Sequence, residues 1–334
     1  MRSRPAGVVG PVESPPCSRQ RWDHGIGRIL QGVPGRREFE VQRNTIEHFY
    51  KYMSLEVGRI VVEHRTLRWS TPGTLNDPYD MQFDLRIEVN QEAVREAALE
   101  KLWDGHYGQE QVPAGNILGV LVNALRGKFP KMSRDEFYRE FAPAIDEGFA
   151  RMMASLPRFQ EETRAILARS RILCLTVAPD NALMWSHYAG QNRGVVLRFR
   201  SVEGLDSPWP MAQPVQYLED MPRLLDDDFL SDMASGRASL NAETLLNRLT
   251  YTKSAEWAYE REWRLSTGLG RNPDEPHEDV PFHPQELDGV ILGCRMPDED
   301  RNWFLETVPR LYPHAAIQKA VLSADRFKLA LEPV

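Results

Sequence analysis

The spacing of hydrophobic residues changes along the chain, and its clearest stretch has a helical period. Between residues 91 and 170 apolar side chains recur every three or four positions, as in Phe137, Phe141, Ile145 and Phe149. This spacing places them on one face of a helix. Ser133 and Glu136 precede the run with the spacing of a capping box. The pattern therefore predicts three or four helices, which form an insertion at about 91–170.

On both sides of this segment, shorter apolar runs are bounded by turn residues and predict strands. The expected strands cover 65–70, 172–177, 195–199, 214–218, 289–293, 317–322 and 327–331. Helical patterns also occur at 240–251 and 298–311. This mixture predicts an α+β fold with a mixed, mostly antiparallel sheet core and a helical insertion. We expect residues 45–334 to form one such domain.

The first 40 residues have a different composition, because they are rich in Arg, Gly and Pro. Such a segment buries too little apolar surface to offset the entropy lost on ordering. Residues 1–40 are therefore predicted to form a disordered or surface-draped tail.

Composition excludes several classes of protein. The net charge of −7 over 334 residues argues against a dedicated nucleic-acid binder. No run of about 18 apolar residues occurs, so we expect no membrane span, and the first residues lack the apolar segment of a secretion signal. The three cysteines lie far apart, which suggests neither a zinc site nor a disulfide framework. We expect a cytoplasmic protein.

The stretch 181–200, NALMWSHYAGQNRGVVLRFR, combines a helical turn, a tight loop and a strand. Trp185 and Tyr188 are three residues apart and share a helix face, whereas His187 points elsewhere. Two interpretations remain open. The stretch is either a packed turn with a buried tryptophan, or the wall of a pocket to which Trp185, His187, Tyr188 and Arg193 contribute.

A polar loop follows the strand predicted at 65–70 and reads TPGTLNDPYDMQF over 71–83. Asn76 and Asp77 can bond their own backbone, and Pro78 keeps Asp77 out of the helical region. The loop is therefore either a structural turn or, given its density of polar groups between apolar segments, part of a site.

Two nearby carboxylates mark a third segment, KSAEWAYEREWRLST at 253–267. If it is a strand, Glu260, Glu262 and Arg264 share one face, and neighbours on that face lie about 7 Å apart. Such carboxylates can hold different protonation states or bind a sugar hydroxyl. The alternative is an exposed polar face.

Polar clusters inside apolar surroundings cost free energy unless they satisfy one another or a ligand. We therefore expect the segments 50–54, 68–80, 183–193 and 260–264 to meet around one cleft.

The chain resembles the bacterial domain of unknown function numbered 2971. The matching blocks are FYKYMS (49–54), RWSTPGTLNDPYD (68–80), LMWSHYAGQNRGVVLRF (183–199), KSAEWAYEREWRL (253–265) and GVILGCRM (289–296). Together they cover roughly residues 45–334. The resemblance implies a compact α+β domain of bacterial origin, but it implies no activity.

The order of three motifs is also similar to that of ADP-ribosyltransferases: Tyr50-Lys51-Tyr52, Ser70-Thr71-Pro72 and Glu260-Arg261-Glu262. Pro72 stands where that pattern has its second serine, and the first motif lacks a clear Arg or His. The resemblance implies NAD as the cofactor and a macromolecular acceptor, as in a toxin or defence factor.

In this hypothesis Glu262 supports an oxocarbenium-like transition state, with Glu260 and His187 as the other catalytic residues. The expected NAD-binding residues come from the other three polar segments, and they are Tyr52, Ser70, Asn76, Asp77, Trp185, Tyr188 and Arg193. Two alternatives remain. One is a non-catalytic module that binds a nucleotide-like molecule or a protein. The other is a metal-dependent nuclease with Asp77, Asp80, His187 and Glu262 as ligands.

Overall fold

A computed structural model describes residues 43–82, 89–109, 111–128, 130–222, 225–240 and 242–334. The tail predicted for residues 1–40 lies outside these ranges. Among the described residues, none of the helices combines the length and apolar character that a membrane span requires.

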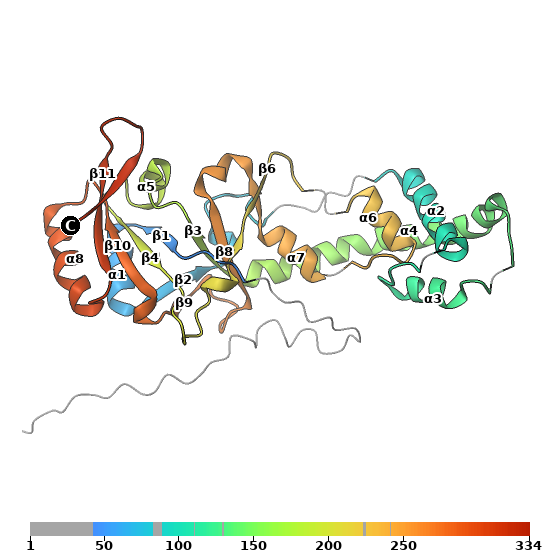
Figure 1. Cartoon of the computed structure of the whole chain (residues 1–334), viewed down its shortest axis with the longest axis horizontal. Helices are drawn as coiled ribbons and strands as arrows, with labels where there is room; N and C mark the ends of the chain where they lie inside the picture. Colours follow the sequence, from blue (N-terminus) through green and yellow to red (C-terminus); the bar gives the residue numbers. More distant parts are fainter. Residues whose placement is uncertain (1–42, 83–88, 110, 129, 223–224, 241) are drawn as a thin grey trace, which may run out of the picture. The chain divides into compact units, whose positions relative to one another are not determined.

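Ten strands of the described chain form one sheet (Figure 1), and most neighbouring strands are antiparallel. They are β1 (Phe49–Met53), β2 (Thr66–Ser70), β3 (Ser170–Thr176), β4 (Val195–Phe199), β5 (Gln213–Pro214), β8 (Glu262–Leu269), β9 (His277–Pro281), β10 (Leu287–Leu292), β11 (Ala316–Leu322) and β12 (Leu329–Pro333). The order is β12-β11-β10-β4-β1-β3-β2-β9, and β8 pairs with both β3 and β5. Only β10 and β11 run parallel among these pairs. The predicted α+β fold with a mixed, mostly antiparallel sheet is confirmed.

The central strands β4 and β10 are buried along almost their whole length, because both faces of the sheet are covered. Val195 and Leu197 of β4 pack into a core that includes residues of α1 (Leu55–His64) and α8 (Asp298–Leu311). Val196, which points to the other face, packs with α5 (Ala182–Tyr188). Helix α5 therefore lies on the opposite face from α1 and α8.

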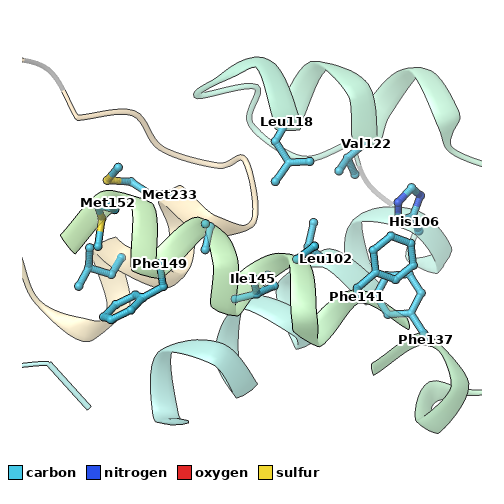
Figure 2. A pocket seen from close by; sticks show the side chains of 14 residues that line it. Leu102, His106, Leu118, Val122, Phe137, Phe141, Ile145, Phe149, Met152 and Met233 are labelled. Atoms are coloured by element: carbon cyan, nitrogen blue, oxygen red, sulfur yellow. The ribbon is translucent and has the colours of Figure 1, made fainter. Parts of the chain in front are cut away.

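The segment with the helical period contains α2 (Gln91–Tyr107), α3 (Ile117–Leu125) and α4 (Arg134–Arg169). The first half of α4 packs with α2 and α3, and its second half shares a core with residues near α6 (Asp227–Ala234) and α7 (Ala242–Thr250). Side chains from α2, α3, α4 and α6, among them Leu102, Val122, Ile145 and Met233, surround an apolar cavity of about 350 Å³ (Figure 2). The phenylalanines of the sequence pattern thus face this core and its cavity.

Five predicted strands differ from the observed strands by one or two residues at one or both ends, and the segments 214–218 and 253–267 differ more. The run 214–218 is divided between β5 and β6 (Gln216–Leu218), and β6 pairs with β7 (Thr252–Ser254) in a separate two-stranded sheet. The run 253–267 is not one strand, because the 3-10 helix η4 (Ala255–Glu260) separates the end of β7 from β8, which begins at Glu262. The remaining 3-10 helices are η2 (Pro72–Thr74), η3 (Trp209–Met211) and η5 (Pro284–Glu286).

Candidate functional site

The four polar segments meet around one cavity of about 250 Å³, as the sequence predicts. Its lining comes from β1, η2 and the loop after it, β3, α5, β7, the end of η4 and the start of β8. The lining residues are Tyr50, Lys51, Tyr52, Thr74, Leu75, Asn76, Asp80, Cys174, Leu175, Thr176, Met184, Tyr188, Lys253, Glu260 and Glu262. We call it the carboxylate pocket.

At the base of the carboxylate pocket lies a buried cluster of five charged side chains. Lys253 Nζ donates to Glu260 Oε2 at 2.6 Å and to Glu262 Oε2 at 3.0 Å. Arg264 donates through Nε to Glu262 Oε1 at 2.7 Å, and through Nη1 and Nη2 to both oxygens of Asp80 at 2.8 and 2.6 Å. Three carboxyl groups therefore face two cations in a region closed to solvent.

Local backbone geometry explains why Glu260 and Glu262 reach the same lysine. They do not follow strand alternation, which is a correction to the sequence interpretation. Glu260 ends η4, and Arg261 takes the left-handed conformation with φ of 47° before β8 begins. This turn brings both carboxylates to Lys253. The period of two holds only for Glu262 and Arg264, both in β8.

The two glutamates have opposite electrostatic environments. Burial alone would raise the pKa of Glu262, but Arg264 and Lys253 outweigh it and hold that pKa at about 2. Burial raises the pKa of Glu260, and Lys253 opposes this rise only in part. The pKa of Asp80 is also raised by burial despite Arg264. Glu262 is thus the more firmly ionised glutamate.

Tyr188 links the loop after η2 to this cluster. Asn76 Nδ2 donates to the Tyr188 hydroxyl at 3.1 Å, and that hydroxyl donates to Glu260 Oε1. Burial and the Glu260 carboxylate raise the pKa of Tyr188, so its hydroxyl keeps its proton. One oxygen of Glu260 is therefore held by a neutral hydroxyl at the pocket wall.

Trp185 and Tyr52 belong to the hydrophobic core below the carboxylate pocket. Their rings meet edge to face at 5.4 Å between centroids. Trp185 is buried and donates through Nε1 to the carbonyl of Pro179 at 2.8 Å, and the Tyr52 hydroxyl donates to the carbonyl of Ala178 at 2.7 Å. Tyr52 still lines the pocket, whereas Trp185 is not among its lining residues.

Five of the predicted site residues lie outside the lining of the carboxylate pocket: Trp185 and the following four. Ser70 ends β2 in register with His277. His187 is exposed, and its Nδ1 lies 3.2 Å from the Tyr259 hydroxyl. Arg193 is exposed in the turn after α5. Asp77 lines a neighbouring cavity instead.

The four residues of the nuclease hypothesis do not converge. Asp80 and Glu262 both bind Arg264, while His187 contacts Tyr259. No group of three or more His, Cys, Asp or Glu residues in the described ranges could hold a metal ion.

Sequence reasoning placed Arg264 beside the glutamates but missed Lys253, the second cation of the cluster. Lys253 and Arg264 are buried, and charged residues are rarely buried without a partner. A signal was present, since both lie in a segment with several aromatic and apolar residues, but their partner Asp80 is more than 170 positions away in the chain.

Part of the chain matches a known protein family. Residues 184–265 match a family model described as "Protein of unknown function (DUF2971)". Searches of the curated proteins and of the solved structures found no match. The matched segment runs from α5 into β8 and so includes Tyr188, Lys253, Glu260 and Glu262. The match confirms the resemblance to the domain of unknown function 2971 over residues 184–265.

Proposed function

We propose that the carboxylate pocket binds the nicotinamide ribose of NAD and that the protein is an ADP-ribosyltransferase-like enzyme. The observation that carries this proposal is the excess of carboxyl groups over cations in the buried cluster. Breaking an N-glycosidic bond develops positive charge on the ribose, and fixed negative charge in a closed site stabilises it. Lys51, which also lines the pocket, would meet a phosphate of the same ligand.

We assign roles to the two glutamates that differ from those in the sequence hypothesis. Both oxygens of Glu262 accept hydrogen bonds from cations, which suits a residue that positions Lys253 and Arg264. Glu260 has one oxygen bound only by the Tyr188 hydroxyl. We therefore assign the carboxylate next to the ribose to Glu260.

In the proposed reaction the bond between ribose C1′ and the nicotinamide nitrogen breaks, and its electron pair leaves with nicotinamide. A nucleophile of the acceptor forms the new bond to C1′ and loses a proton. His187 lies outside the pocket and takes no step in this scheme.

The test is incubation of the full chain with NAD labelled in its adenylate part, together with a bacterial lysate. We expect nicotinamide release and transfer of label to a macromolecule. Glu260→Gln should lower the rate roughly 100-fold or more, as removal of a group that stabilises the transition state does. Glu306→Gln, an exposed change in α8, should leave the rate unchanged. Absence of both release and transfer would refute the proposal.

A second candidate function, a protein-interaction module, is favoured by the outer face of α3. Ile117, Val120, Leu121 and Leu125 are all exposed there, and clustered exposed apolar residues are typical of interaction surfaces. A protein that binds NAD without releasing nicotinamide would instead favour the other non-catalytic alternative, a nucleotide-binding module.

A further inference from the structure

We infer that a second cavity, next to the carboxylate pocket, binds an organic cation: a guanidinium or ammonium group carried on an alkyl chain. The cavity measures about 440 Å³ and is lined by residues of the segments 77–80, 218–222 and 252–257. It shares Asp80 and Lys253 with the carboxylate pocket. We call it the Asp77 cavity.

The central observation is one carboxylate oxygen without a partner. Asp77 is only 3% exposed, and its Oδ1 accepts from the backbone N–H of Tyr79 at 2.9 Å. Its Oδ2 is buried and accepts no hydrogen bond from the described residues. A buried carboxylate oxygen that lacks a donor is costly. A ligand that carries a positively charged N–H group would remove this cost.

The charges around the Asp77 cavity favour the same ligand. Its described lining holds five acidic residues and one basic residue, and these are Asp77, Asp80, Glu219, Asp220, Glu256 and Lys253. The cluster already neutralises two of them, because Asp80 binds Arg264 and Lys253 binds Glu260 and Glu262. The charged lining residues that remain are all acidic, and each of them attracts a cation that enters the cavity.

Aromatic rings add a second mode of recognition. Trp257 and Tyr79 line the cavity, and Tyr79 is 61% exposed. The ammonium of Lys253 lies 5.0 Å from the centroid of the Trp257 ring, so this ring already faces a cation. Ring faces attract guanidinium and ammonium groups through their quadrupole.

A bare metal ion fits less well than an organic cation. Within the described residues no three His, Cys, Asp or Glu side chains converge to hold one, whereas divalent cations such as Ca²⁺ need six or more oxygen ligands. An alkyl guanidinium or ammonium needs one directed acceptor, which Asp77 Oδ2 supplies, and an apolar wall for its chain, which Met221, Pro222 and Trp257 supply.

The experiment is a ligand-observed NMR titration of the full chain, without NAD, so that its outcome is independent of the proposed enzyme activity. The probes are n-butylguanidinium, n-butylammonium and the neutral n-butylurea, which matches the guanidinium in shape. We expect at least one of the two cations to bind and the urea not to bind. The tighter cation identifies the head group.

Asp77→Asn is the informative variant, because its side-chain oxygen still accepts from Tyr79 while the second oxygen becomes an amide. It should weaken binding of the cation roughly tenfold or more, since charge-assisted hydrogen bonds are about twice as strong as neutral ones. Asp325→Asn, an exposed change between β11 and β12, should have no effect. The inference is overturned if neither cation binds, if n-butylurea binds equally well, or if Asp77→Asn binds like the wild type with an unchanged melting temperature.

Discussion

At the scale of single residues, Lys253 stabilises the candidate site by pairing with its carboxyl groups. It lies within 4 Å of three carboxyl groups, at 2.6, 3.0 and 3.7 Å from Glu260, Glu262 and Asp80. Replacing it with Met leaves these buried groups with Arg264 as their one remaining cation in the cluster. We expect Lys253→Met to lower the free energy of unfolding by about 3–5 kcal/mol, the usual cost of removing one partner from a buried ion pair.

Urea unfolding measures this loss, and Lys319→Met is the matched control. Lys319 makes an exposed ion pair with Glu332 at 3.5 Å, and such pairs contribute about 0–1 kcal/mol. Equal losses in the two variants would mean that the buried cluster contributes no more than a surface pair.

Glu262 gives the cluster a dependence on pH. Its pKa of about 2 lies below its ordinary value of 4.5, so the folded state favours the ionised form. Its contribution is therefore present above pH 4.5 and is lost as pH falls from 4.5 toward 2. The shift corresponds to about 3 kcal/mol. The raised pKa of Glu260 acts in the opposite direction.

The effect of Glu262 is isolated by comparing wild type with Glu262→Gln in urea unfolding across pH 3 to 7. We expect the difference in unfolding free energy to be largest above pH 5 and to shrink as pH falls. A constant difference over this range would show that the charge of Glu262 does not stabilise the fold.

The sequence predicted some residues of the site better than others, and the reason is the range of the interactions. Trp185 and His187 could be assigned to opposite environments because both sit on one helical turn, and the structure has Trp185 buried and His187 exposed. The contact of Asp80 with Arg264 could not be predicted, because the two residues lie 184 positions apart in the chain. Only the folded sheet brings them together. The left-handed backbone conformation of Arg261 could not be predicted either, because arginine has no preference for it.

At the scale of elements, α4 offers a local test of helix stability. Gly148 lies inside this helix, and an added Cβ would meet no atom within 4 Å. Because glycine loses more backbone entropy than alanine in a helix, Gly148→Ala should stabilise the protein by about 0.5–1 kcal/mol.

The control for α4 is Gly119→Ala in α3. There the new Cβ would overlap the backbone carbonyl oxygen of Gly236, so the same substitution should destabilise the protein. Urea unfolding followed by far-UV circular dichroism measures both variants. A stabilised Gly119→Ala would show that α3 and the loop at Gly236 do not pack as described.

Elements themselves were predictable where one period dominates. The helix at 298–311 and the strand at 195–199 have the same bounds in the structure. The prediction of a single strand at 214–218 was wrong. Its two ends pair with different partners, β8 and β7, and the backbone N–H of Val215 between them donates to the carbonyl of Glu262 at 2.9 Å.

At the scale of the whole described unit, the hydrophobic cores differ in how they are built. The sheet core combines residues from both ends of the described chain, from Phe49 to Tyr312. The helical segment instead has a core of largely neighbouring elements, from α2 to the first half of α4. Strand order depends on long-range pairing, so the sequence could predict a mixed sheet but not its topology.

This difference leads to a prediction about local stability. Strands β4 and β10 are paired on both edges, and every residue of β10 is buried. Helix α3 has only Gly119 and Val122 buried. Amide hydrogens exchange slowest where opening requires loss of the most buried contacts. Hydrogen exchange of the full chain, followed by mass spectrometry, should therefore show peptides from β4 and β10 as the slowest. Peptides from α3 should exchange faster than those from α2, α4 and α8. If α3 were protected as strongly as β10, its exposed apolar face would have to be covered, and exchange at several protein concentrations would then show whether a second copy of the chain covers it.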